Sequence, residues 1–186
     1  MPDSARPRHT HTVLIGLMGC GKSTIGRELS RRTGHALLDT DALIEEQTGL
    51  TIPELFERHG EAHFRRLETA LLRYLHEEEP GVPYVISTGG GIITRPENRR
   101  LLRGLGFVVW LHAPVAVLVQ RTAHTGNRPL LQGTDPEGKL ARLLREREAF
   151  YRETAHWALD VSRPGIREAA ELVDEAARAF FSGGAA

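Results

Sequence analysis

The sequence has one cysteine, no long apolar run and no net charge. These three features argue against a disulfide, a transmembrane helix and a strongly charged binding surface. Cys20 has no second cysteine with which to form an intramolecular disulfide, which fits a reducing compartment. No apolar run approaches the ~18 residues of a transmembrane helix. The 24 basic residues balance the 24 acidic ones, so no global field attracts nucleic acid or a membrane. We therefore expect a cytoplasmic protein with neither of these partners.

The two ends of the chain also lack order-forming patterns. Residues 1–11 are polar and contain no hydrophobic segment of the kind a signal peptide needs. Residues 182–186 are small. We expect flexible tails at 1–11 and 182–186 around an ordered core of residues 12–181. With no internal repeat and no long linker, the 186 residues predict one domain, 1–186, and we expect a monomer.

Short apolar runs alternate with amphipathic helical patterns along the core. The expected strands cover residues 12–15, 36–38, 84–87, 107–111 and 158–161. The expected helices cover residues 23–33, 61–79, 95–104, 115–122, 136–155 and 166–181. This alternation predicts an α/β fold with a five-stranded parallel sheet and helices on both faces.

A glycine-rich motif follows the first expected strand and opens a helix. Gly16-Leu-Met-Gly-Cys-Gly-Lys22-Ser23 fits the pattern G-x-x-x-x-G-K-[ST] in the context that this pattern requires. Its backbone N–H groups are expected to surround phosphate oxygens, with Lys22 at the β- and γ-phosphates and the Ser23 hydroxyl on Mg²⁺. The alternative is a plain glycine-rich turn. Cys20 lies inside the loop, either as a small residue that fills a loop position or as a redox-active thiol.

Two more polar motifs follow the next two strands. Asp39 and Asp41 come just past the second strand, and Ser87-Thr-Gly-Gly-Gly91 ends the third. Ligands gather at the carboxyl ends of parallel strands, so we expect these motifs to meet the glycine-rich loop. In an extended backbone Asp39 and Asp41 share a side, which suggests one carboxylate near the metal and one near an acceptor hydroxyl. The alternative is a helix N-cap.

Two arginines stand out on the expected helices. Arg147 falls in the middle of an apolar helical stripe, where a guanidinium needs an anionic partner. It is either a clamp for a substrate anion, or a structural ion pair or snorkelling side chain. Arg65 lies at the edge of another stripe, with Glu61 four residues before it and Glu68 three after. An ordinary exposed ion pair is the alternative for Arg65.

A polar stretch with a glycine lies between the fourth strand's helix and the next helix. Residues 122–134 have the composition of a mobile lid and include Arg128, which could neutralise charge during phosphoryl transfer. A plain surface loop is the alternative.

Together these motifs resemble shikimate kinase over residues 12–178. The resemblance rests on GLMGCGKSTIG, LLDTDALIE, GEAHFRRLE, STGGG, RTAHTGNRPLL and REREAFY. It implies a P-loop kinase fold like that of nucleoside monophosphate kinases, with an acceptor-binding segment at residues 40–70 and a closing lid. The implied reaction transfers the γ-phosphoryl of ATP to the 3-hydroxyl of shikimate, in chorismate and aromatic amino acid biosynthesis, with Mg²⁺.

The resemblance also assigns residues to each ligand. The implied acceptor contacts are Asp41, Arg65, Gly89, Gly90, Gly91 and Arg147. The implied nucleotide contacts are Gly19, Cys20, Gly21, Lys22, Ser23, Thr24, Arg121, Arg128, Arg163 and Pro164. Ser23, Asp39 and Ser87 match the positions that hold Mg²⁺. Asp41, Lys22 and Arg128 match the catalytic positions.

Two other functions fit parts of the pattern. A kinase for gluconate or a nucleoside monophosphate would share the glycine-rich loop, but the set Asp41, Arg65 and Arg147 suits a polyol carboxylate better. A ligand-sensing domain of a transcription regulator would require a helix-turn-helix region, and only eleven residues precede the first strand.

Overall fold

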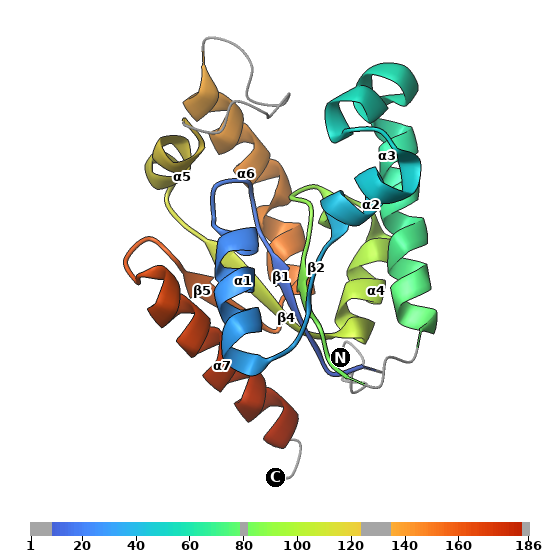
Figure 1. The fold of residues 1–186 in the computed structure, drawn as a ribbon. Helices are drawn as coiled ribbons and strands as arrows, with labels where there is room; N and C mark the ends of the chain where they lie inside the picture. The colour runs from blue at the N-terminus through green and yellow to red at the C-terminus, as the bar shows by residue number, and fades with distance from the viewer. Residues whose placement is uncertain (1–8, 79–81, 124–134, 184–186) are drawn as a thin grey trace.

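The computed structural model describes residues 9–78, 82–123 and 135–183. Five strands form one parallel sheet in the order β2-β3-β1-β4-β5 (Figure 1). They are β1 His11–Ile15, β2 Leu37–Asp39, β3 Val85–Ser87, β4 Gly106–His112 and β5 Trp157–Asp160. The predicted five-stranded parallel sheet is confirmed, and its central strand β1 carries the glycine-rich loop at its carboxyl end.

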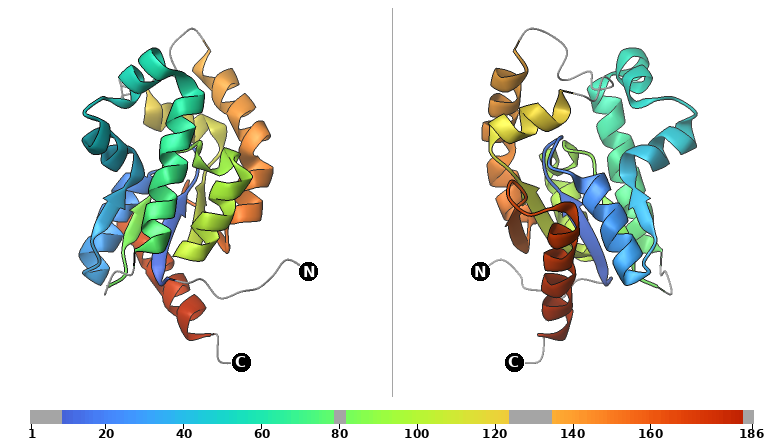
Figure 2. Two further views of the ribbon diagram at one scale, coloured as in Figure 1. Left: turned by 90° about the vertical axis from the view of Figure 1, so that its right-hand side faces the viewer. Right: turned by 60° about the vertical axis from the view of Figure 1, so that its left-hand side comes forward.

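Helices cover both faces of the sheet, as predicted (Figures 1 and 2). α1 Lys22–Thr33 packs beside α7 Ile166–Ser182 on one face, and α4 Pro96–Leu105 packs against α3 and α6 on the other. The remaining elements are α2 Thr40–Thr48, α3 Ile52–Glu77, the 3₁₀ turn η1 Ile92–Thr94, α5 Val115–Thr122 and α6 Pro136–Thr154. No helix in the described ranges is both long and apolar enough to cross a bilayer.

The centre of the sheet is the core of the molecule. Val13, Leu14 and Ile15 of β1 have no exposed surface, and β4 is buried along nearly its whole length. Strands buried on both faces are continuous apolar runs, which is why these two were visible in the sequence.

The region after β2 differs from the prediction. No helix was expected over residues 40–60, yet α2 covers residues 40–48 and α3 begins at Ile52 rather than residue 61. Gly60 interrupts α3 with φ 77°, a conformation outside the helical region. The start of α3 is fixed by a capping box between Thr51 and Glu54. Elsewhere element ends agree with the prediction to within about two residues.

The expected tails and lid lie partly outside the described residues. Residues 1–8, 184–186 and 124–134 are not described. His9 and His11, which belong to the segment expected to be a flexible tail, are buried, with 8% and 2% of their surfaces exposed. His9 and His11 are therefore part of the packed fold, because their rings pack with each other and with His76 and Tyr84.

Candidate active site

The glycine-rich loop connects β1 to the first turn of α1. Lys22 folds back over the loop, and its Nζ donates to the carbonyl oxygens of Gly16 at 2.8 Å and Leu17 at 3.1 Å. It also lies 3.7 Å from the Sγ of Cys20, a fully buried thiol. The ammonium is thereby held at the mouth of the loop, where the helix dipole also favours an anion.

A cavity of about 560 Å³ opens beside this loop. Among the predicted nucleotide contacts, those that line it are Gly19, Cys20, Gly21, Lys22, Ser23, Thr24, Arg121 and Pro164. Arg121 comes from the end of α5, and its Nη2 donates to the carbonyl oxygen of Val161 at 2.8 Å. Arg163 is exposed and does not line the cavity. The structure thus gathers two distant segments at the loop but leaves Arg163 outside.

Three side-chain oxygens meet between the loop and the sheet. The Ser23 hydroxyl donates to Oδ2 of Asp39 at 2.8 Å and lies 3.3 Å from the hydroxyl of Ser87. Each comes from a different element: α1, the end of β2 and the end of β3. A carboxylate and two hydroxyls are hard oxygen donors, which fit the preference of Mg²⁺.

Asp39 also caps α2. Its Oδ1 accepts hydrogen bonds from the backbone N–H groups of Asp41 at 3.1 Å and Ala42 at 3.5 Å. The helix-cap interpretation of the Asp-Thr-Asp motif is therefore confirmed, while the other oxygen of Asp39 faces Ser23 and leaves the metal role a prediction. The extended geometry expected for the pair is wrong, because Asp41 lies in the first turn of α2.

A second cavity, of about 320 Å³, shares Lys22 and Ser23 with the cavity beside the phosphate loop, and Asp39 also lines it. All six predicted acceptor contacts line it. It also has residues that the sequence did not assign to a site: Met18, Glu45, Ile52, Pro53, Phe56, Phe64, Glu68 and Thr88. Several come from residues 45–56, where the helices were not foreseen. The sequence did carry a signal for this part of the cavity: Ile52 and Phe56 are hydrophobic but belong to none of the helical stripes that were expected.

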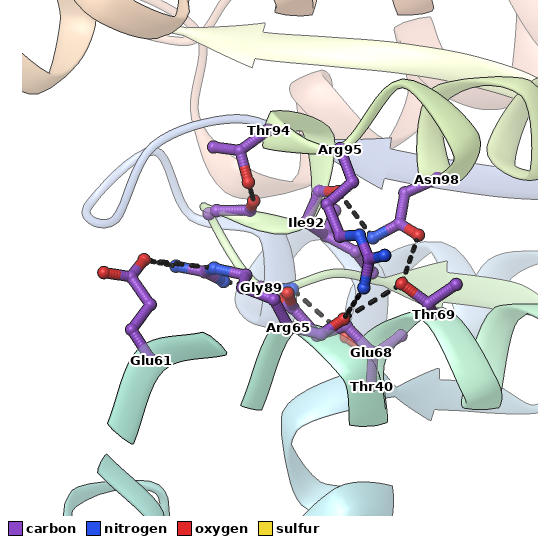
Figure 3. A network of polar contacts seen from close by, with 12 residues as sticks. Thr40, Glu61, Arg65, Glu68, Thr69, Gly89, Ile92, Thr94, Arg95 and Asn98 are labelled. Atoms are coloured by element: carbon purple, nitrogen blue, oxygen red, sulfur yellow. Dashed lines mark hydrogen bonds and ion pairs between the residues drawn. The ribbon is translucent and has the colours of Figure 1, made fainter. Parts of the chain in front are cut away.

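Arg65 is held between two carboxylates in this cavity (Figure 3). Its Nε and Nη2 donate to Oε1 of Glu61 at 3.1 and 2.7 Å, and its Nη1 donates to Oε2 of Glu68 at 2.8 Å. The Arg65 side chain is 10% exposed, so this is not the exposed ion pair of the alternative interpretation. Both predicted partners are present, and they fix the plane of the guanidinium.

Two acidic groups in the cavity are electrostatically unusual. Burial raises the pKa of Glu68 to about 7, although the Arg65 guanidinium pulls it down. Burial also raises the pKa of Asp41, and the neighbouring Asp39 carboxylate adds to the effect. Oδ1 of Asp41 and Oε1 of Glu68 are buried without a hydrogen-bond partner among the described residues. Buried polar atoms are nearly always paired, so these two oxygens mark a place where a ligand fits.

The glycine segment Gly89–Gly91 passes between these groups and allows close approach. A Cβ on Gly89 would lie 2.6 Å from Oδ1 of Asp41, and one on Gly91 would overlap the Arg65 guanidinium. Side chains at these positions would displace the charged groups that line the cavity.

Arg147 reaches the same segment from α6. It is buried, with 7% of its surface exposed, and its Nη1 donates to the carbonyl oxygen of Gly90 at 3.3 Å. No carboxylate of the described residues forms an ion pair with it. A buried cation that lines a cavity and has no ion-pair partner among the described residues suits an anionic ligand.

The remaining predicted residue, Arg128, lies outside the described residues. Apart from Arg163 and Ser87, the other predicted positions line two cavities that share Lys22 and Ser23, one beside the phosphate loop and one beside Asp41. A parallel sheet with a G-x-x-x-x-G-K-S loop and an adjacent acceptor cavity defines a P-loop kinase.

Comparison with known proteins identifies the family. The family model for shikimate kinase matches residues 18–178, and the chain belongs to this family. A shikimate kinase of Halorhodospira halophila is 47% identical over 163 residues, 88% of this chain and 90% of that protein.

Solved structures of relatives agree with this assignment. The structure of shikimate kinase from Acinetobacter baumannii in complex with shikimate has a TM-score of 0.84 and 40% identity, and the match covers 98% of this chain and 97% of that one. Shikimate kinase from Aquifex aeolicus has a TM-score of 0.73 and 34% identity, covering 94% of this chain and 98% of that one.

Proposed function

We propose that this protein transfers the γ-phosphoryl group of ATP to the 3-hydroxyl of shikimate, giving shikimate 3-phosphate and ADP. The observation that carries the proposal is the acceptor cavity. It has two buried arginines, Arg65 and Arg147, and an unpartnered Asp41 oxygen, and it shares Lys22 with the nucleotide side. The relative whose structure holds shikimate supports the choice of acceptor.

On the nucleotide side, the phosphate loop surrounds the phosphates with backbone N–H groups. Lys22 neutralises charge on the β- and γ-phosphates. Ser23, Asp39 and Ser87 hold Mg²⁺, directly or through its water ligands. The ion, when bound, supplies positive charge to the phosphate oxygens. Arg121 and Pro164 border the base, and Arg163 stays a prediction of the resemblance alone.

On the acceptor side, the planar guanidinium groups of Arg65 and Arg147 bind the carboxylate of the substrate, because each can form two parallel hydrogen bonds. Asp41 accepts a hydrogen bond from the reacting hydroxyl and takes its proton during transfer. The raised pKa of Asp41 suits this task, since it brings the carboxyl group closer to the pH at which it operates. Gly89–Gly91 offers backbone groups to the acceptor.

The wider organisation follows the same proposal. Residues 1–186 form one domain, with residues 40–70 as the acceptor-binding segment and 122–134 as a lid whose Arg128 neutralises charge on the transferring group. The enzyme works in the cytoplasm as a monomer. It serves chorismate and aromatic amino acid biosynthesis.

A coupled assay of ADP release tests the proposal. Purified protein is given ATP and Mg²⁺ with shikimate, quinate, gluconate or a nucleoside monophosphate, and Lys22→Ala is the matched inactive control. Shikimate should give the highest kcat/KM, and mass spectrometry should detect the 3-phosphate. Faster turnover of gluconate or a nucleotide, or ADP release that Lys22→Ala retains, would overturn it.

A further inference from the structure

A buried tyrosine, Tyr151, contacts the glycine segment Gly89–Gly91 without lining the acceptor cavity itself. Tyr151 has no exposed surface, and its hydroxyl donates to the carbonyl oxygen of Gly90 at 2.5 Å. Its ring stacks on Trp110 of β4, with centroids 5.7 Å apart and planes inclined by 9°. Burial raises the pKa of the Tyr151 hydroxyl, so the group stays a neutral donor. The tyrosine is thus held rigidly with its hydroxyl aimed at one backbone carbonyl.

The same carbonyl also accepts from Arg147, one helical turn earlier on α6. The longer bond, 3.3 Å against 2.5 Å, comes from the arginine. The shorter one comes from the tyrosine, which does not line the cavity. Arg147 therefore remains able to turn its guanidinium to a ligand while Tyr151 keeps the carbonyl in place.

The two ends of the glycine segment are fixed by other residues (Figure 3). The N–H of Gly89 donates to the Thr40 hydroxyl at 3.1 Å, and the carbonyl oxygen of Gly91 accepts from the Thr94 hydroxyl at 2.8 Å. The peptide between Gly90 and Gly91 lies between these two anchors. Glycine rotates about its backbone bonds more freely than other residues, so this peptide needs an anchor of its own.

The orientation of that peptide determines where the N–H of Gly91 points. The described chain has no cis peptide bond, and in a trans peptide the C=O and the following N–H point in opposite directions. The Gly90 carbonyl faces Tyr151 on α6, so the Gly91 N–H faces the other way. Gly91 lines the acceptor cavity, and its N–H makes no hydrogen bond to any other described residue. Gly91 is buried, so its N–H is a donor that an oxygen of a bound substrate could satisfy.

We propose that Tyr151 is a positioning residue for acceptor recognition: its bond to Gly90 holds the Gly90–Gly91 peptide so that the Gly91 N–H donates to an oxygen of the acceptor. The inference rests on the proposed function for the identity of the acceptor. It adds a residue outside the cavity that governs affinity for the acceptor and not for the nucleotide.

Tyr151→Phe tests this, because phenylalanine keeps the ring on Trp110 and removes only the hydroxyl. We expect KM for shikimate to rise about three- to tenfold, the effect of losing one neutral hydrogen bond. KM for ATP and kcat at saturating acceptor should stay within about twofold. Thr154→Val is the matched control. It removes another buried hydroxyl from α6, one that donates to Phe150 and not to the glycine segment, and it should leave KM for shikimate unchanged.

A second readout follows the peptide itself and does not depend on which acceptor the enzyme uses. In protein labelled with ¹⁵N-glycine, the amide signal of Gly91 should shift in Tyr151→Phe while those of the phosphate loop stay in place. An unchanged Gly91 signal, or equal rises in KM in both variants, would overturn the proposal. If wild-type protein does not phosphorylate shikimate, the proposed function fails, and the Gly91 signal still decides the role of Tyr151.

Discussion

Glu68 should cost the folded protein stability at neutral pH, and the cost can be measured. Its carboxyl group is fully buried, and its pKa rises from 4.5 to about 7 on folding. Between these values the folded protein holds a proton that the unfolded chain releases, so stability falls as pH rises through this window. Linkage across a shift of this size gives a loss of about 2–3 kcal/mol between pH 5 and pH 8.

Glu68→Gln removes this loss. The amide has the shape of the protonated acid, cannot ionise, and still offers an oxygen to Nη1 of Arg65. We expect the stability of the variant to rise by about 2–3 kcal/mol relative to wild type when the pH is raised from 5 to 8. Urea unfolding at the two pH values, with the slope m held common, measures the difference directly.

Glu61→Gln is the matched control, because Glu61 binds the other side of the same guanidinium. Its side chain is 56% exposed, and water solvates the charge, so removing it should bring no comparable gain at high pH. Parallel pH profiles for wild type and Glu68→Gln would refute the reasoning. That result would show that the ion pair with Arg65 offsets the whole desolvation cost of the buried Glu68 carboxylate.

The other predictions concern the cavity and the sheet. Asp41→Asn should bind shikimate within about tenfold of wild type but lose about 10²–10⁴ in kcat, as calorimetry and single-turnover kinetics would show. If binding collapses and the chemical step survives, Asp41 is only an anchor. Arg147→Ala should raise KM for shikimate by at least about tenfold and leave KM for ATP nearly unchanged, since a desolvated charge contact costs about 2–5 kcal/mol. Shikimate methyl ester used as well as the acid would contradict this. Burial lowers the pKa of His11 to about 4, and its Nδ1 accepts from the N–H of Tyr84, so stability should fall as pH drops from about 6.5 to 4. His11→Gln should lose less stability over this range in urea unfolding, and an equal loss would exclude His11 as the cause.

The sheet was predictable because its strands are short apolar runs followed by polar motifs. The helices of residues 40–60 were not. In α2 only Thr40 and Ile44 are buried, so no apolar stripe exists to mark it. In α3, the non-helical residue Gly60 interrupts the helical periodicity, so the turns from Ile52 to Gly60 do not continue the apolar stripe that follows. The local signals for the start of α3 were the pair Thr51 and Glu54, which fits a capping box, and Pro53 in the first turn.

The site was predictable as a set of residues but not as a geometry. The convergence of Lys22, Asp39 and Asp41 followed from their positions after parallel strands. The extended arrangement of the two aspartates was wrong, because a cap formed where a strand had been assumed to continue. Glu68 was expected only as a partner of Arg65. Its unpartnered oxygen depends on where the glycine segment passes, and contacts of that kind join residues far apart in the chain.

The acceptor side of the site is held together by a polar framework behind it (Figure 3). Asn98 on α4 is fully buried; its amide nitrogen donates to the carbonyl oxygen of Ile92 at 2.9 Å, and its oxygen accepts from Thr69 at 2.8 Å. The Thr69 hydroxyl also lies 2.9 Å from the carbonyl oxygen of Arg65. One amide thus joins the helix that carries Arg65 to the turn that follows the glycine segment. Because Asn98 and Thr69 are buried, moving α3 would break hydrogen bonds that water cannot readily replace. This framework therefore holds the helix that carries Arg65 against the turn that follows the glycine segment.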